Sequence, residues 1–271
     1  MTMMGLSRAS LSSVEERFNV VAAGADLTAL SEDLFAVAGL LDREHGLRRA
    51  LSDPSRPAEQ KAQTARVLLE GKISEAALET TAAAVSARWT RAGDVADALE
   101  RVAVIAAAAA AEAAGQIDDV EDELFRFGRI VASNGDLRRF LGDAAVTAER
   151  KAEFLRSLLG GKVAPVTSLL VVQAVAHPRG RSLETGLAEF GTLVAAQRQR
   201  LVAVVRSAVA LSDGQKQRLA ALLRDSYGRD VHLNVEVDPR VIGGFSVRVG
   251  DEIIDTTIAA RIEEVRRRLA G

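Results

Sequence analysis

The sequence predicts a mainly α-helical protein in which two related helical-bundle modules are followed by a small C-terminal α/β domain. Up to about residue 200, apolar residues recur at spacings of three and four among abundant Ala, Leu, Glu and Arg, as in amphipathic helices. Part of this helical region is repeated 90 residues further along the chain. Beyond residue 200, apolar and polar residues alternate, which is the period of a β-strand.

The composition favours a protein of several modules without nucleic-acid or membrane character. The 271 residues exceed the usual size of one compact domain. Lys and Arg total 35 against 37 Asp and Glu, so no broad basic surface is expected for a phosphate backbone. Residues 1–18 hold no apolar run like a secretory signal, and the most apolar stretches, 102–111 and 169–176, are shorter than the roughly 20 residues that span a bilayer. Any membrane association is therefore expected to be peripheral.

The repeat keeps charged and apolar positions in one register, which a shared composition alone does not require. At the constant offset of 90, Leu47, Arg48, Arg49, Leu51, Asp53, Ala58, Glu59, Lys61, Ala62, Arg66, Leu68, Leu69, Gly71 and Lys72 match Leu137, Arg138, Arg139, Leu141, Asp143, Ala148, Glu149, Lys151, Ala152, Arg156, Leu158, Leu159, Gly161 and Lys162. We therefore expect an extra helical module at residues 1–100, a second copy at 101–200 and the C-terminal domain at 201–271.

Within the second copy, an alanine-rich stretch at residues 106–114 is expected to be helical, because alanine is the best helix former. Val102 and Ile105 give this helix an apolar edge. We therefore take Val102 and Ile105 as candidate contacts with a partner.

No cofactor or metal site is expected. Gly71-Lys72 and Gly161-Lys162 superficially suggest a phosphate-binding loop, but the Gly four residues earlier and the following Ser or Thr are both missing, so helix termination explains the glycines. The absence of cysteine excludes disulfides and thiolate metal sites. The histidines lack partners at metal-ligand spacing and are expected on the surface or at helix caps: His45, His177 and His232.

The C-terminal region reads as strand, helix, strand, hairpin and helix. A strand is expected at 201–209, a helix from the capping box of Ser212 and Gln215 to Gly228, and strands at 231–237 and 245–249. Gly250-Asp251 should form a turn that returns residues 252–254 as a hairpin. A terminal helix would carry an apolar face formed by Ile258, Ile262, Val265 and Leu269. Of these residues, we take Ile258, Ile262 and Val265 as further candidate contacts with a partner.

The C-terminal run from Val231 to Asp255 closely resembles the signature of the delta/OSCP subunit family of F-type ATP synthase. The residues that carry the resemblance are the acidic turn at Asp238, the Gly243-Gly244 pair, the Gly250-Asp251 turn and Ile253-Ile254-Asp255. Residues 100–190 resemble the family's N-terminal six-helix domain, including Arg179-Gly-Arg181-Ser-Leu183 before its last helix. Thr256 departs from the Gly that is usual in the family, the usual Tyr near Leu99 is missing, and the first copy is an addition like that of extended actinobacterial forms.

The resemblance implies a stator subunit of the peripheral stalk that has no active site and no cofactor. It implies that the chain links the catalytic head of alpha and beta subunits to the b-type stalk subunit and resists rotor torque during ATP synthesis. The implied contacts are the N-terminal helices of the alpha subunits for the bundle and the b-type subunit for residues 201–271. The implied place is the cytoplasmic face of the cell membrane, as a peripheral part of the complex.

Two other classes of function stay open from the residues alone. One is a helical regulatory or RNA-binding adaptor, which the balanced charge disfavours. The other is an enzyme that uses carboxylates of the C-terminal domain in acid and base catalysis, for which turn formation is the simpler explanation: Glu236, Asp238 and Asp255.

Overall fold

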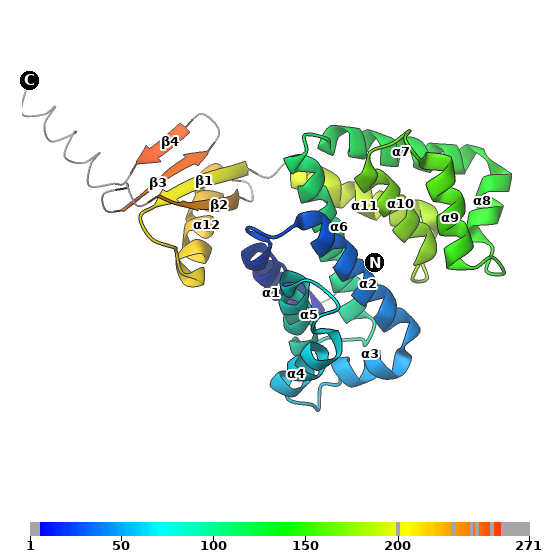
Figure 1. Cartoon of the computed structure of the whole chain (residues 1–271), viewed down its shortest axis with the longest axis horizontal. Coiled ribbons are helices and arrows are strands. Elements are labelled where there is room, and N and C mark those ends of the chain that lie inside the picture. The colour runs from blue at the N-terminus through cyan, green and yellow to red at the C-terminus, as the bar shows by residue number, and fades with distance from the viewer. Residues whose placement is uncertain are drawn as a thin grey trace, which may run out of the picture. The chain divides into compact units, whose positions relative to one another are not determined.

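The computed structural model describes residues 6–198, 201–228, 231–238, 241, 244–249 and 252–255. The chain forms two compact units, residues 1–198 and 199–271 (Figure 1). The first is helical and the second combines a sheet with a helix, so the predicted fold class is confirmed.

The first unit contains eleven helices among its described residues. In chain order they are α1 (Leu6–Ala22), α2 (Leu27–Arg43), α3 (His45–Ser52), α4 (Ala58–Leu69), α5 (Glu75–Ser86), α6 (Asp94–Ala113), α7 (Ile117–Ser133), α8 (Gly135–Gly142), α9 (Ala148–Leu159), α10 (Pro165–Ala176) and α11 (Leu183–Arg198).

The repeat seen in the sequence recurs in the order and bounds of the helices. Each helix from α2 to α5 begins and ends 90 residues before its counterpart from α7 to α10. The 20-residue α6 lies between the two sets, packing against α2 from the first copy and against α10 and α11 from the second (Figure 1). It therefore stands both as the last helix of the first copy and as the first helix of the second. The boundary expected at residue 100 falls inside this continuous helix.

One continuous apolar core runs through the whole first unit, from Val14 in α1 to Val194 in α11. The alanine-rich stretch is helical as expected up to Ala113, but it faces the protein's own interior, since Ala106 and Ala108 are both fully buried. Small side chains let neighbouring helices approach α6 closely on several sides. Its alanines therefore pack within the core.

Local signals explain why equivalent helices end at equivalent residues. Gly71 and Gly161 take φ angles of 71° and 69° just after α4 and α9, a conformation that ends a helix at little cost for glycine. Lys72 and Lys162 each donate from Nζ to the carbonyl oxygen four residues earlier, at 2.8 Å and 2.9 Å. The Gly-Lys pairs are thus helix ends, as predicted.

Equivalent carboxylates also fix the start of equivalent helices. Asp33 on α2 accepts a hydrogen bond from the backbone N–H of Ser74, directly before α5, at 2.7 Å. Glu123 on α7 accepts one from the N–H of Ala164, directly before α10, at 2.9 Å. Each bond satisfies a donor that a helix N-terminus would otherwise leave unpaired, and so ties two helices of one copy together.

The second unit is a four-stranded sheet with one described helix. Its elements are β1 (Leu201–Ser207), α12 (Asp213–Tyr227), β2 (Val231–Val237), β3 (Phe245–Val249) and β4 (Glu252–Asp255). The strand order is β2-β1-β3-β4, with β1 parallel to β2 and antiparallel to β3, and β3 antiparallel to β4. The parallel pair requires a crossover, which α12 supplies.

The sequence located most of these elements correctly. The capping box of Ser212 and Gln215 starts α12, and Gly228 ends it with φ at 65°. The first strand was expected to reach Val209 but ends at Ser207, whose hydroxyl oxygen accepts the N–H of Val209 in a turn. The hairpin of β3 and β4 is confirmed by its pairing. The expected terminal helix lies outside the described residues.

Candidate functional site

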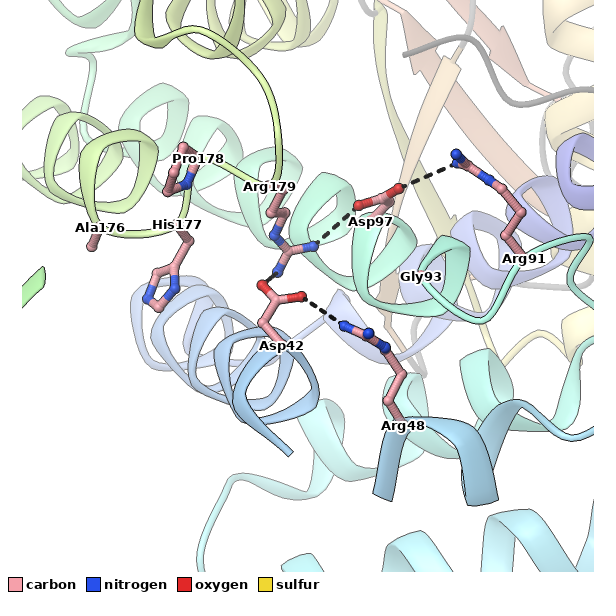
Figure 2. Close-up of a pocket in the computed structure, with 9 residues that line it drawn as sticks. All are labelled: Asp42, Arg48, Arg91, Gly93, Asp97, Ala176, His177, Pro178 and Arg179. Carbon is pink, nitrogen blue, oxygen red and sulfur yellow. Dashed lines mark hydrogen bonds and ion pairs between the residues drawn. The ribbon is translucent and has the colours of Figure 1, made fainter. Parts of the chain in front are cut away.

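A charged pocket of about 520 Å³ lies within the first unit, where α2, α6 and the loop before α11 meet (Figure 2). It is lined by Asp42, Arg48, Arg91, Gly93, Asp97, Ala176, His177, Pro178 and Arg179. The side chain of Arg179 points between the two carboxylates, with Asp42 on one side and Asp97 on the other (Figure 2). Residues of both copies thus meet at this pocket.

Arg179 is held in an unusual backbone conformation by ion pairs from three directions. Its φ of 51° makes it the one non-glycine residue with a positive φ in the described part of the chain. Its guanidinium lies 3.0 Å from the Asp42 carboxylate and 3.4 Å from that of Asp97. Its Nε lies 3.4 Å from Glu100 without hydrogen-bond geometry. Such a backbone costs roughly 1–3 kcal/mol and persists only where the surroundings enforce it.

Arg181 forms a second buried connection two residues later. It donates to both carboxylate oxygens of Glu100, at 2.9 Å and 2.8 Å, and to Glu189 of α11 at 2.8 Å. Its guanidinium carbon also lies 5.9 Å from the centre of the Phe190 ring. The Glu100 and Arg181 side chains are 5% and 15% exposed, so breaking this pair would leave the buried Glu100 carboxylate with Arg179 beside it but without its hydrogen-bond donors.

Burial shifts the pKa values of three groups in and around the pocket. It raises the pKa of Asp97 and of Glu100, against the opposing effect of the Arg179 and Arg181 guanidinium groups. It lowers the pKa of His177, which packs against Gly39 of α2.

Among the described residues, no group of three or more His, Cys, Asp or Glu side chains is placed to hold a metal ion. The cluster pairs its charges internally and joins the two copies through α6.

A second concavity, of about 790 Å³, lies between α7 and α11 in the second copy. Its lining includes several small residues: Gly128, Ala132, Ala188, Gly191, Thr192 and Ala195. Phe125 stands at its edge and is 65% exposed, which is unusual for a phenylalanine. Its volume exceeds that of the charged pocket.

Val102 and Ile105, the expected partner contacts of the helical region, lie inside the core. They are 0% and 3% exposed, because α6 is covered by helices of both copies. A partner could reach them only by opening that core. The surface available to a partner is therefore formed by other residues.

The structure gives backbone roles to the signature residues that it describes. The N–H of Asp238 donates to the carbonyl oxygen of Ser207 at 2.9 Å, which ties the end of β2 to the end of β1. Gly244 has φ at 82°, which favours glycine just before β3. Asp255 pairs with Ser246 at the end of the hairpin. The remaining predicted residues lie outside the described part of the chain: Gly243, Gly250, Ile258, Ile262 and Val265.

Several residues of these sites were not singled out as site residues from the sequence. Arg179 and Arg181 were visible only as part of a motif before the last helix, and their partner Glu100 lies about 80 positions away. Phe125 could have been noticed because it occupies the position of the second copy that is equivalent to Phe35 in the first. The equivalence in sequence does not tell that Phe35 is buried and Phe125 is exposed.

Comparison with known proteins gives matches over the whole chain. The sequence pattern of the family described as ATP synthase delta (OSCP) subunit matches residues 102–269. The "ATP synthase subunit delta" of Streptomyces griseus is 50% identical over 271 residues, which cover 99% of this chain and all of the relative. The protein of the same name from Thermobifida fusca is 48% identical over 269 residues, again 99% of this chain and all of the relative.

A chain of the Toxoplasma gondii mitochondrial ATP synthase hexamer aligns with 62% of this chain and 97% of its own length at 22% identity, with a TM-score of 0.28. The family assignment therefore rests on the sequence matches. Residues 1–101 lie outside the family pattern but inside the alignments with the bacterial relatives, so the first copy is shared with those proteins. From the family pattern and the full-length relatives, this chain belongs to the ATP synthase delta (OSCP) subunit family.

Proposed function

We propose that this chain is the stator subunit that joins the catalytic head of an F-type, proton-translocating ATP synthase to its peripheral stalk. The observation that carries the proposal is the 50% identity, over the full length, to a protein named ATP synthase subunit delta. The task of such a subunit is mechanical and non-catalytic. The rotor's torque would turn the head as well during ATP synthesis unless a static link held it.

The build of the first unit suits a link under load. Its two copies share one core and one helix, so neither can turn against the other without exposing buried apolar surface. The buried pairs of Arg179 and Arg181 with Glu100 add directional connections across the same junction. A body of this kind transmits force with little internal displacement.

The finer assignments concern partners and location. The helical unit would receive N-terminal helices of the alpha subunits, and residues 201–271 would meet the distal end of the b-type stalk subunit. The extra copy at residues 1–100 would supply additional docking surface. No helix in the described part of the chain is long and apolar enough to cross a bilayer. As a member of such a complex, the protein would lie at the cytoplasmic face of the cell membrane, held there by its partners.

The test is co-purification from membranes of a strain that carries a tagged copy of the full chain. Recovery of alpha, beta and b-type subunits with the tag supports the proposal, and recovery of none of them contradicts it. Removing residues 1–98 is a poor test of the extra copy, because it would cut into α6 and uncover its face toward α2. Surface substitutions on the intact chain address the docking surface without that loss.

A further inference from the structure

We propose that His177 is a pH-sensitive contact between the two copies, which holds the loop of residues 177–180 against α2 while the imidazole is neutral and releases that loop when the imidazole gains a proton. This goes beyond the proposed function, which requires only that the two copies stay joined. The loop lies between the end of α10 and Arg181, which stays paired with Glu100 and Glu189. Release therefore opens one connection between the copies and leaves another in place.

The imidazole ring of His177 fits closely against α2. His177 is the C-cap residue of α10, and its side chain extends toward α2 (Figure 2). A Cβ on Gly39 would lie 3.1 Å from the ring Cε1 and 3.4 Å from Nε2, so the ring occupies the space that this glycine leaves open. Glycine is a poor helix former, and the close contact accounts for its presence inside α2. The ring thus joins a helix of the first copy to one of the second.

Cations lie near the ring on two sides. A guanidinium nitrogen of Arg43 lies 3.4 Å from the same point beside Gly39, and Arg179 follows two residues along the chain. A proton on the imidazole would add another positive charge to this partly buried space. The charged groups that act on the ring are Asp42 and Arg43 on α2, Arg179 in the loop and Glu149 on α9, with Arg48, Arg91 and Asp97 lining the same pocket.

Together these surroundings favour the neutral ring. Burial, followed by the charge of Arg179, lowers the pKa of His177 from its ordinary value of 6.5, and the carboxylates of Asp42 and Glu149 oppose this only in part. In the released loop the imidazole would regain its ordinary proton affinity. The closed loop therefore binds the proton more weakly than the open loop, and a fall in pH below 6.5 shifts the equilibrium toward the open one.

The loop is poised to move once this contact fails. Arg179 and Gly180 have consecutive positive φ angles of 51° and 73°, and for arginine this conformation is strained. The ion pairs of Arg179 with Asp42 and Asp97 sustain it. A protonated His177 would compete with Arg179 for the Asp42 carboxylate and so weaken that hold. The charged pocket of about 520 Å³ beside the loop gives it room to rearrange.

The first copy has the same helix end without the proton-sensitive group. Ala87 ends α5 where His177 ends α10, and the N–H of each donates to the carbonyl oxygen four residues earlier, at 3.2 Å and 3.0 Å. Trp89 stands where Arg179 stands and has a negative φ. Residues 87–90 include no side chain that titrates near neutral pH. The first copy is therefore an internal control.

The test is amide hydrogen exchange of the full-length protein at pH 7.5 and pH 5.5, with labelling times scaled for the change in chemical exchange rate. The reporters are the N–H of His177 and the N–H of Arg181, which donates to the carbonyl oxygen of Pro178 at 2.9 Å. We expect both to exchange about tenfold faster at the lower pH. The N–H of Ala87 should change by less than about twofold, because the first copy stays closed.

Two variants assign the response to one side chain. His177→Gln has a planar polar side chain that does not titrate, so it should keep the slow exchange of the Arg181 N–H at pH 7.5 and lose the acceleration at pH 5.5. His45→Gln makes the same change at an exposed histidine of α3 and should keep the acceleration of about tenfold. Circular dichroism should show both variants folded.

A measurement on the parent protein covers the case in which His177→Gln does not fold. An NMR titration of the His177 imidazole signal, assigned through the backbone, gives the pH at which the closed loop takes up the proton. Exchange of the Arg181 N–H should accelerate below pH 6.5 and level off at that measured pH, because one proton accounts for the whole effect.

Equal exchange of the Arg181 N–H at the two pH values in the parent, or an acceleration that persists in His177→Gln, would overturn the inference. An equal acceleration at Ala87 would also overturn it, because the whole unit would then be opening. The same holds for a His177 titration at or above pH 6.5, or for exchange that levels off at a pH other than that of His177. None of these results depends on which subunits co-purify with the chain, so the proposed function is tested separately.

Discussion

Truncating Leu170 in the second copy should destabilise the first copy as well. Leu170 lies on α10 and is 0% exposed within the core that both copies share. Replacing a wholly buried leucine by alanine removes apolar contacts and leaves a cavity, which costs about 3 kcal/mol. A helical unit of this size should unfold in urea with a slope of about 2–3 kcal/mol per molar. Leu170→Ala should therefore lower the urea midpoint by about 1 M.

The assay uses the protein's single tryptophan, Trp89, which belongs to the first copy. Trp89 is 7% exposed and its indole N–H donates to the carbonyl oxygen of Ala84 at 2.8 Å, so unfolding of the first copy will change its fluorescence. If α6 makes the two copies one cooperative unit, the Trp89 transition must shift although the substitution lies in the other copy. The main loss of the far-UV circular dichroism signal, which comes from the helices of the first unit, should have the same midpoint.

An unchanged Trp89 midpoint in Leu170→Ala, accompanied by loss of part of the helical signal at lower urea, would refute the shared unit. The two copies would then unfold as independent domains. Leu158→Ala is the control within the same copy, because Leu158 is 38% exposed and its truncation should cost less than about 1 kcal/mol. Its Trp89 midpoint should stay close to that of the parent protein.

Three further predictions follow from the same packing. Arg181→Met should cost up to about 3 kcal/mol in urea unfolding, because it removes both hydrogen bonds to the buried Glu100 and leaves only Arg179 beside that carboxylate. The double variant with Glu100→Leu should cost less than the sum of the single changes, and additive costs would argue against a direct pair. Hydrogen bonds from Arg66 and Arg17 lower the pKa of Glu79, so its contribution to stability is present above its ordinary pKa and lost as the pH falls through the lowered one. In urea midpoints measured from pH 7 to pH 3, the difference between the parent and Glu79→Gln should therefore shrink toward low pH, and a difference that grows would contradict this sign. Gly191→Ala should raise the free energy of unfolding by up to about 1 kcal/mol, because alanine favours the helix and its Cβ meets nothing within 4 Å; a loss of stability would show that the space is needed within the chain.

Sequence reasoning located the elements well because their signals are local. The helix of the C-terminal unit was predicted from the capping box of Ser212 and Gln215 and from Gly228, and the structure places these residues at its two ends. The ends of α4 and α9 were anticipated from Gly71 and Gly161. In each case the deciding contacts join residues a few positions apart, so the pattern in the chain contains the physical cause.

The candidate sites were harder to predict because they depend on contacts between distant residues. Arg181 meets Glu100 across 81 positions, and Arg179 meets Asp97 across 82. The apolar edge of Val102 and Ile105 was correctly assigned to a helix, but an apolar edge predicts burial and does not tell whether the cover comes from the same chain or from a partner.

The sequence by itself determined the class of fold, the 90-residue repeat, the change from helical to strand period near residue 200 and the family, because each of these is written in spacings along the chain. Only the tertiary structure decided that the two copies share α6 and one core. It also decided that Phe35 is covered while Phe125 is open. The physical reason is that equal residues at equal places in a repeat have the same local propensities but different neighbours, and burial depends on the neighbours.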